Sequence, residues 1–169
     1  LMSSINWFFT DSHEDFAIFQ IVVKNDSKDG TYYPQYINRI TLDSNGEYAL
    51  CYQARTETLL INDTPTETSL PEGYGVAPFL YVHRVLDFIF SEFGYTITEN
   101  PFKTDKELSS LVILNNAADC CVTGILNYAD LMPDCTIEDF LNALYVRFGL
   151  VYNVSSDTKT ATLRLIRDI

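Results

Sequence analysis

The chain has 169 residues, enough for one domain or two small ones, and its hydrophobic fraction of 47% is typical of a sequence that buries a core. Its formal net charge is −12, and its few basic residues are not clustered, which argues against a nucleic-acid ligand. No stretch approaches the ~20 apolar residues that a membrane-spanning helix needs. We therefore expect a folded chain without membrane insertion and, because it begins with Leu1 rather than Met, a fragment or processed piece of a longer protein.

The first part of the chain has a β pattern. Runs of aromatic and β-branched residues, or of alternating apolar and polar residues, predict four or five strands of an antiparallel meander. Asn45 and Gly46 form a hairpin turn signal. The predicted strands cover residues 5–9, 16–23, 36–42, 48–53 and 58–61.

Residues 62–77 are rich in Thr, Pro and Gly, a composition typical of a linker that contains an ordered turn. We place a domain boundary within this segment. The prediction is a β-rich meander domain over residues 1–69 and an α+β domain over residues 70–169.

The second part contains two similar helix-glycine-strand units. A helix that opens at Pro78 ends at Gly94 and leads into a strand, and a helix capped by Thr136 ends at Gly149 and leads into a C-terminal β-hairpin. The inward stripes are predicted as Val82, Val85, Leu86, Ile89 and Phe93 in the first helix and Phe140, Leu141, Leu144, Tyr145 and Phe148 in the second. The units align without gaps at an offset of 55 residues. Duplication and convergence on one common local pattern both remain open, and either way we expect the units to share a sheet or to pack as neighbours.

The four cysteines do not have the spacing of a zinc site or a redox motif. We expect free thiols packed as small apolar groups, and the alternative of a disulfide between Cys135 and Cys120 or Cys121 stays open.

The acidic and histidine residues do not form a recognisable catalytic or metal site. The carboxylates at 130–139 lack the alternating register of a calcium loop and are better explained by helix capping and solvation. His13 lies in a polar segment that we expect to be a solvated turn, and His83 with Asp87 is expected to be an ordinary surface pair. We therefore predict no catalytic residues, no metal and no cofactor.

Candidate partner-contact residues are exposed aromatic side chains, which bury much area at low entropic cost. Core packing is the competing explanation for each of them. The candidates are Trp7, Tyr32, Tyr33 and Tyr74.

Five short motifs resemble prophage structural proteins of gut bacteria that are taken as tail or baseplate components. They are LPEGYG at 70–75, APFL at 77–80, IF at 89–90 followed by FGY at 93–95, LVILNN at 111–116 and DLMPD at 130–134. Residues 136–166 are also similar to the helix-hairpin modules of tail-hub proteins and to the short N-terminal domains of secretins and TonB-dependent receptors. This resemblance implies a partner-docking role without catalytic residues.

The leading hypothesis is a structural subunit of a phage-like tail or baseplate, found in the virion or in the bacterial cytoplasm during assembly. Its partners would be other copies of itself or neighbouring tail proteins, so we expect a homo-oligomer. The alternative is a periplasmic or cell-surface module that docks a protein or a glycan, and an enzyme ranks third.

Overall fold

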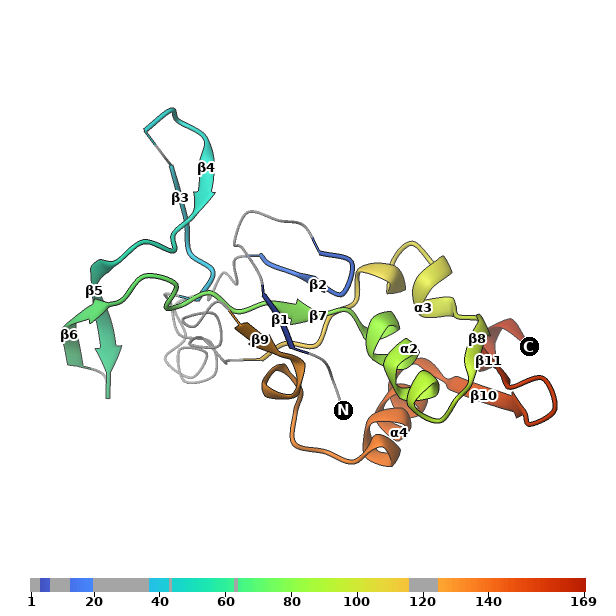
Figure 1. Ribbon diagram of the computed structural model, residues 1–169. Helices are drawn as coiled ribbons and strands as arrows, with labels where there is room; N and C mark the ends of the chain where they lie inside the picture. The colour runs from blue at the N-terminus through green and yellow to red at the C-terminus, as the bar shows by residue number, and fades with distance from the viewer. Residues whose placement is uncertain (1–3, 7–12, 20–36, 43, 63, 116–124) are drawn as a thin grey trace. The chain divides into compact units, whose positions relative to one another are not determined.

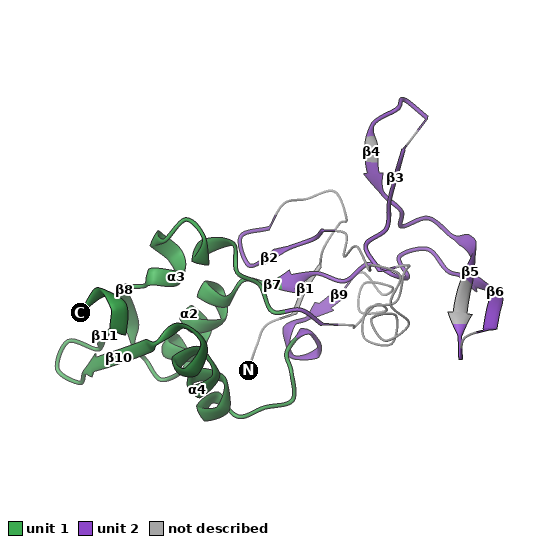
Figure 2. Ribbon diagram, turned by 180° about the vertical axis from the view of Figure 1, so that it is seen from behind, with its two compact units in different colours: residues 1, 80–113, 132–169 green, residues 2–79, 114–131 purple. Residues whose placement is uncertain are grey.

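The computed structural model describes residues 4–6, 13–19, 37–42, 44–62, 64–115 and 125–169 (Figure 1). Helices and small, mostly antiparallel sheets occur together, which confirms the predicted α+β class. The chain forms two compact units, coloured separately in Figure 2. Unit 1 contains residues 80–113 and 132–169, and unit 2 contains residues 2–79 and 114–131. The domain boundary predicted between residues 69 and 70 stays a prediction.

Unit 1 is a three-stranded sheet with helices. In order along the chain, it contains α2 (Val82–Glu92), β8 (Thr96–Glu99), α3 (Pro101–Thr104), η1 (Leu108–Ser110), α4 (Ile137–Phe148), β10 (Leu150–Ser155), β11 (Thr160–Leu165) and η3 (Ile166–Asp168). The strand order is β10-β11-β8, with β10 antiparallel and β8 parallel to the central strand β11. The strands that follow the two predicted helices thus share one sheet, as expected.

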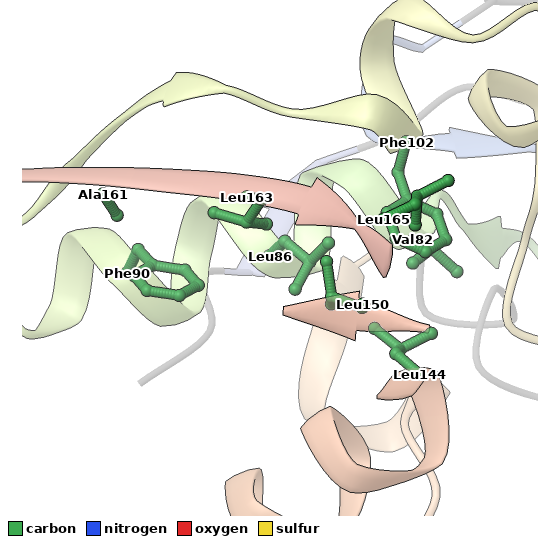
Figure 3. Close-up of a cluster of buried hydrophobic side chains, with 9 residues drawn as sticks. All are labelled: Val82, Leu86, Phe90, Phe102, Leu144, Leu150, Ala161, Leu163 and Leu165. Atoms are coloured by element: carbon green, nitrogen blue, oxygen red, sulfur yellow. The ribbon is translucent and has the colours of Figure 1, made fainter. Parts of the chain in front are cut away.

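The core of unit 1 lies where α2 and α4 pack on this sheet (Figure 3). Ala161, Leu163 and Leu165 of β11 are at most 1% exposed, while Arg164 between the two leucines is exposed, so burial follows the apolar-polar alternation of the strand. The remaining core side chains in Figure 3 come from both helices, from α3 and from β10: Val82, Leu86, Phe90, Phe102, Leu144 and Leu150.

The predicted cap of α4 is present. The Thr136 hydroxyl accepts a hydrogen bond from the Asp139 amide at 3.1 Å, and the Asp139 carboxylate accepts one from the Thr136 amide at 3.3 Å. Hydrogen bonds from Thr136 hold the pKa of Asp139 below its usual value. Gly149 ends the helix with a φ of 72°.

Unit 2 is built from paired short strands rather than from the predicted meander. Its strands are β1 (Ser4–Asn6), β2 (Phe16–Ala17), β3 (Ile40–Leu42), β4 (Tyr48–Leu50), β5 (Arg55–Ile61), β6 (Thr64–Leu70) and β9 (Ile125–Asn127), with η2 (Tyr128–Leu131) after them. β1 pairs with β9, β2 pairs with β7 (Phe79–Leu80), and β3–β4 and β5–β6 are hairpins. The prediction of a meander is therefore wrong, because β1 pairs with β9, which lies more than a hundred residues further along the chain.

One further expectation for unit 2 is corrected, and one buried polar side chain stands out. Residues 64–70, assigned to a linker, form strand β6, because their β-branched threonines favour an extended chain and Asn62 turns it at a φ of 50°. Asn38 is buried, since its side chain donates to the Ala77 carbonyl at 2.7 Å and accepts from the Ala77 amide at 2.8 Å. A buried amide satisfied in this way fixes the backbone that it bonds.

Candidate docking surface

An apolar groove of about 860 Å³ opens on unit 1. The end of α2, the first turns of α4 and the strand β10 form it. Its lining consists of Ile89, Phe90, Phe93, Tyr95, Ile137, Glu138, Leu141, Asn142, Tyr145, Leu150, Val151, Tyr152 and Val154.

The groove exists because the helices cover only part of the sheet. Leu150, Tyr152 and Val154 alternate along β10 and share the face that packs on the core. Leu150 is 3% exposed, whereas Tyr152 is 52% and Val154 is 43% exposed. The Tyr152 ring touches Phe90 edge-on at 5.6 Å between ring centroids, which holds it at the groove wall.

Large apolar side chains remain exposed around this groove. Phe93 is 60%, Tyr145 is 50% and Ile137 is 42% exposed. Together with Tyr152 and Val154 they form an exposed apolar surface, and exposed apolar surfaces often mark contact sites on a protein.

The groove is nearly free of charge although the chain is acidic. Glu138 is the one charged residue in its lining, and unit 1 carries ten acidic and seven basic side chains in all. The Lys159 amine lies 5.2 Å from the centre of the Tyr95 ring, next to the lining. A partner can therefore cover the groove without desolvating many charges.

A second, polar hollow of about 550 Å³ lies at the end of β8. Its acidic side chains are paired: Glu99 binds Arg164 at 2.9 Å, and Asp87 lies 3.9 Å from Lys103. The hydrogen bond from Arg164, and then its charge, lower the pKa of Glu99. Glu99 is therefore ionised near neutral pH and is a poor proton donor there.

The predicted partner-contact residues are only partly described. Trp7, Tyr32 and Tyr33 lie outside the described residues. Tyr74 is half-buried, its amide donates to the Pro71 carbonyl at 3.1 Å, and it does not line the groove. Its role as a partner contact stays a prediction.

The groove aromatics were missed at the sequence level because two of them match the inward helical stripes. Phe93 and Tyr145 were assigned to the core, and both assignments are wrong. Two features of the sequence could have indicated exposure. Tyr145 has a polar hydroxyl end, and Phe93 follows the last turn of α2.

The segment around His13 is more ordered than expected. Asp15 is 7% exposed and accepts a hydrogen bond from the Tyr128 hydroxyl at 2.8 Å. His13 Nδ1 accepts from the Asp15 amide at 3.1 Å, and its ring stacks on Phe16 at 4.5 Å. The predicted solvated turn is wrong for Asp15, which is buried and bonded to Tyr128, whereas Glu14 beside it is exposed.

The other candidate residues do not assemble into a chemical site. Within the described ranges, no group of three or more histidine, cysteine or acidic side chains could hold a metal ion. Cys51 and Cys135 are free thiols, and Cys120 and Cys121 lie outside the described residues. Glu138 and Asp139 occupy the first turn of α4, where negative charge is favourable.

His83 is more buried than we expected for a member of a surface pair with Asp87. Its Nδ1 atom is buried without a hydrogen-bond partner among the described residues, and its ring stacks on Tyr81 at 5.2 Å. Burial lowers its pKa below 6.5; Asp87 opposes this shift, and Arg84 and Lys103 reinforce it.

We expect this histidine to make unit 1 less stable as the pH falls below about 6.5. The unfolded chain then binds a proton that the folded chain resists, so part of the stability is lost as the pH falls. Urea unfolding followed from pH 7.5 to 5 should show this loss in the wild type and a flatter profile in His83→Gln. An unchanged profile in the variant would contradict the prediction. The exposed carboxylates with lowered pKa values, such as Glu99 and Asp105, change the folding stability only near pH 4 and below, so they do not affect this test.

Comparisons with known protein families, curated proteins and solved structures found no match to this chain. In the described part of the chain, none of the helices has the length and apolar character needed to cross a bilayer.

Proposed function

We propose that this chain is a non-enzymatic structural protein of a phage-like tail or baseplate, which assembles through protein-protein contacts. The observation that carries the assembly role is the exposed apolar groove between α2, α4 and β10. The tail or baseplate setting rests on the sequence motifs that resemble prophage structural proteins. In this setting the protein works in the virion, or in the bacterial cytoplasm during assembly.

The occupant that we propose for the groove is a second copy of the same chain. Two copies with a net charge of −12 each repel one another unless their contact surfaces avoid the acidic side chains. The groove lining meets this condition, because Glu138 is its one charged residue. The apolar side chains of one copy can cover those of the other across a two-fold axis.

Substituting Tyr152 by Asp tests this contact. Tyr152 is an exposed aromatic in the groove, and a negative charge there would have to be buried near Glu138. We expect the dissociation constant of the dimer to rise by at least about tenfold, the usual cost of losing an aromatic anchor. Sedimentation and light scattering over a concentration series of the full chain measure it.

The matched control is Asn153→Asp. Asn153 is the next residue of β10, is also exposed and points to the opposite face, so the added charge is the same but lies outside the groove. This variant should associate as the wild type does. A wild-type chain that is monomeric at all concentrations, or equal effects of both variants, would overturn the proposal.

A further inference from the structure

A second surface for assembly lies on the β5–β6 hairpin of unit 2. The two strands pair antiparallel over their full length, from Arg55 opposite Leu70 to Ile61 opposite Thr64. Among the described residues they form a sheet of their own. A two-stranded hairpin is marginally stable in water, and a third strand or a helix normally supports it.

The register shows which backbone groups point away from the hairpin. Two residues connect Ile61 to Thr64, so this closing pair exchanges its hydrogen bonds, and bonded and non-bonded pairs alternate from there. The non-bonded residues direct their N–H and C=O groups outward. On β5 these are Thr56, Thr58 and Leu60, and on β6 they are Pro65, Glu67 and Ser69.

The two outer edges differ in chemistry. Pro65 has no N–H to offer a neighbouring strand, and Glu67 places a charge beside it, which are two usual ways of protecting a sheet edge. The β5 edge has neither proline nor charge at its outward positions, and Thr56 and Thr58 are exposed. As far as the described residues show, the hairpin is thus closed to strand addition on β6 and open to it on β5.

We propose that β5 pairs antiparallel with β5 of a second copy, which gives a four-stranded sheet across a two-fold axis. Full overlap of the strand with itself places Thr58 opposite Thr58 and Thr56 opposite Leu60, so the outward groups of both copies meet.

Charge supports a second copy as the occupant and selects this register. In full overlap Glu57 lies opposite Leu59 and Arg55 opposite Ile61, so like charges do not face each other. A shift of two residues that places Thr56 opposite Thr58 would set Glu57 against Glu57. Within each copy Glu57 is already paired with Arg55 at 2.8 Å and with Arg39.

This contact rests on the proposed assembly function and extends it. One two-fold contact produces a dimer, whereas two different two-fold contacts on one chain can build a larger ring or filament. The hairpin and the groove would together provide the two contacts.

A cysteine pair tests the strand pairing directly. In a full chain whose native cysteines are replaced by Ala, Thr58→Cys should form a disulfide-linked dimer on mild oxidation, because residues opposite each other in a bonded pair lie about 5.5 Å apart. The control is Glu67→Cys, which is exposed and directly opposite Thr58 within the hairpin. In the proposed sheet the two copies of residue 67 are three strand spacings, roughly 14 Å, apart, so this variant should stay uncrosslinked. Equal crosslinking of both variants, or none with Thr58→Cys, would overturn the proposal.

A backbone test uses proline. Thr58→Pro removes an outward N–H from β5 in the way that Pro65 lacks one on β6, and we expect it to weaken this contact by at least about tenfold. Glu67→Pro removes an outward N–H from the edge that does not pair and should leave association unchanged. An equal response to both substitutions would refute the assignment of the β5 edge.

The two contacts can be separated by repeating the crosslinking with Tyr152→Asp. Crosslinking that persists in this background supports the hairpin contact whether or not the groove proposal holds. If Thr58→Cys fails to crosslink while Tyr152→Asp still weakens association, the hairpin contact is wrong and the groove contact stands.

Discussion

Leu163→Ala is expected to lower the free energy of unfolding of unit 1 by about 3 kcal/mol. Leu163 is 1% exposed and lies in the middle of the central strand β11. Outside β11, the members of its core cluster come from the helices α2, α3 and α4 and from strand β10, so they cannot all move to fill the space that the missing methyl groups leave (Figure 3). The lost transfer free energy and the residual cavity therefore add.

Urea unfolding followed by circular dichroism at the helix band measures this effect. The described α-helices, α2, α3 and α4, all belong to unit 1, so this signal reports on that unit. The control is Asn153→Ala, a change on the exposed face of β10 that should stay within about 0.5 kcal/mol of the wild type. If the two variants unfold at the same urea concentration, the side chains around Leu163 do not form the core described here.

Gly149→Val is expected to cost roughly 3 kcal/mol, and Gly94→Val roughly half as much. Both glycines end a helix at positive φ, 72° and 76°, where a residue with a Cβ is strained. The two positions differ in how much room an added side chain has. A Cβ on Gly149 would lie 3.4 Å from the Ile166 Cβ, whereas a Cβ on Gly94 has nothing within 4 Å. The branched side chain should therefore displace Ile166 only at position 149.

The Gly149→Val and Gly94→Val variants also test whether folding stability and dimer formation change together. Gly149 sets the turn between α4 and β10, which are two walls of the groove. Gly149→Val should weaken dimer formation as well as folding. Urea unfolding and sedimentation of both variants measure the two effects, and equal destabilisation by the two substitutions would show that the contact with Ile166 is unimportant.

The local structure of unit 1 follows closely from its sequence. Thr136, Gly94 and Gly149 mark helix ends through hydrogen bonds and backbone angles that involve only their chain neighbours. The apolar-polar alternation along β11 likewise matches which side chains are buried, because one face of that strand packs on helices.

Unit 2 shows why distant pairing escapes such reasoning. The apolar runs predicted strands, but the partners of β1 and β2 lie far along the chain, and a short strand does not specify its partner. The hairpin β5–β6 was missed because Pro65 and its polar threonines read as a linker, although a proline is tolerated on an edge strand at a position whose backbone points outward.

The candidate sites were the least predictable feature. Helical periodicity identifies the side of a helix that carries apolar residues, but not how far the neighbouring element extends over it. Tyr145 and Phe93 fit the pattern of core residues and are exposed, because the elements packed against α2 and α4 end before they cover these side chains.

From the sequence alone came the α+β class, the two helix-glycine-strand units with the Thr136 cap and the two terminal glycines, and the absence of clustered basic charge that would favour nucleic acid. These properties depend on residues that are close in the chain or on composition. The helix start predicted at Pro78 was wrong, because Phe79–Leu80 form strand β7 and α2 begins at Val82. Only the tertiary structure decided that the strands of both helix-glycine-strand units share one sheet, that an apolar groove lies beside β10, and that, among the described residues, β6 is the one strand paired with β5. Burial and edge exposure depend on which distant segments come together, and the periodicity of a single segment does not contain that information.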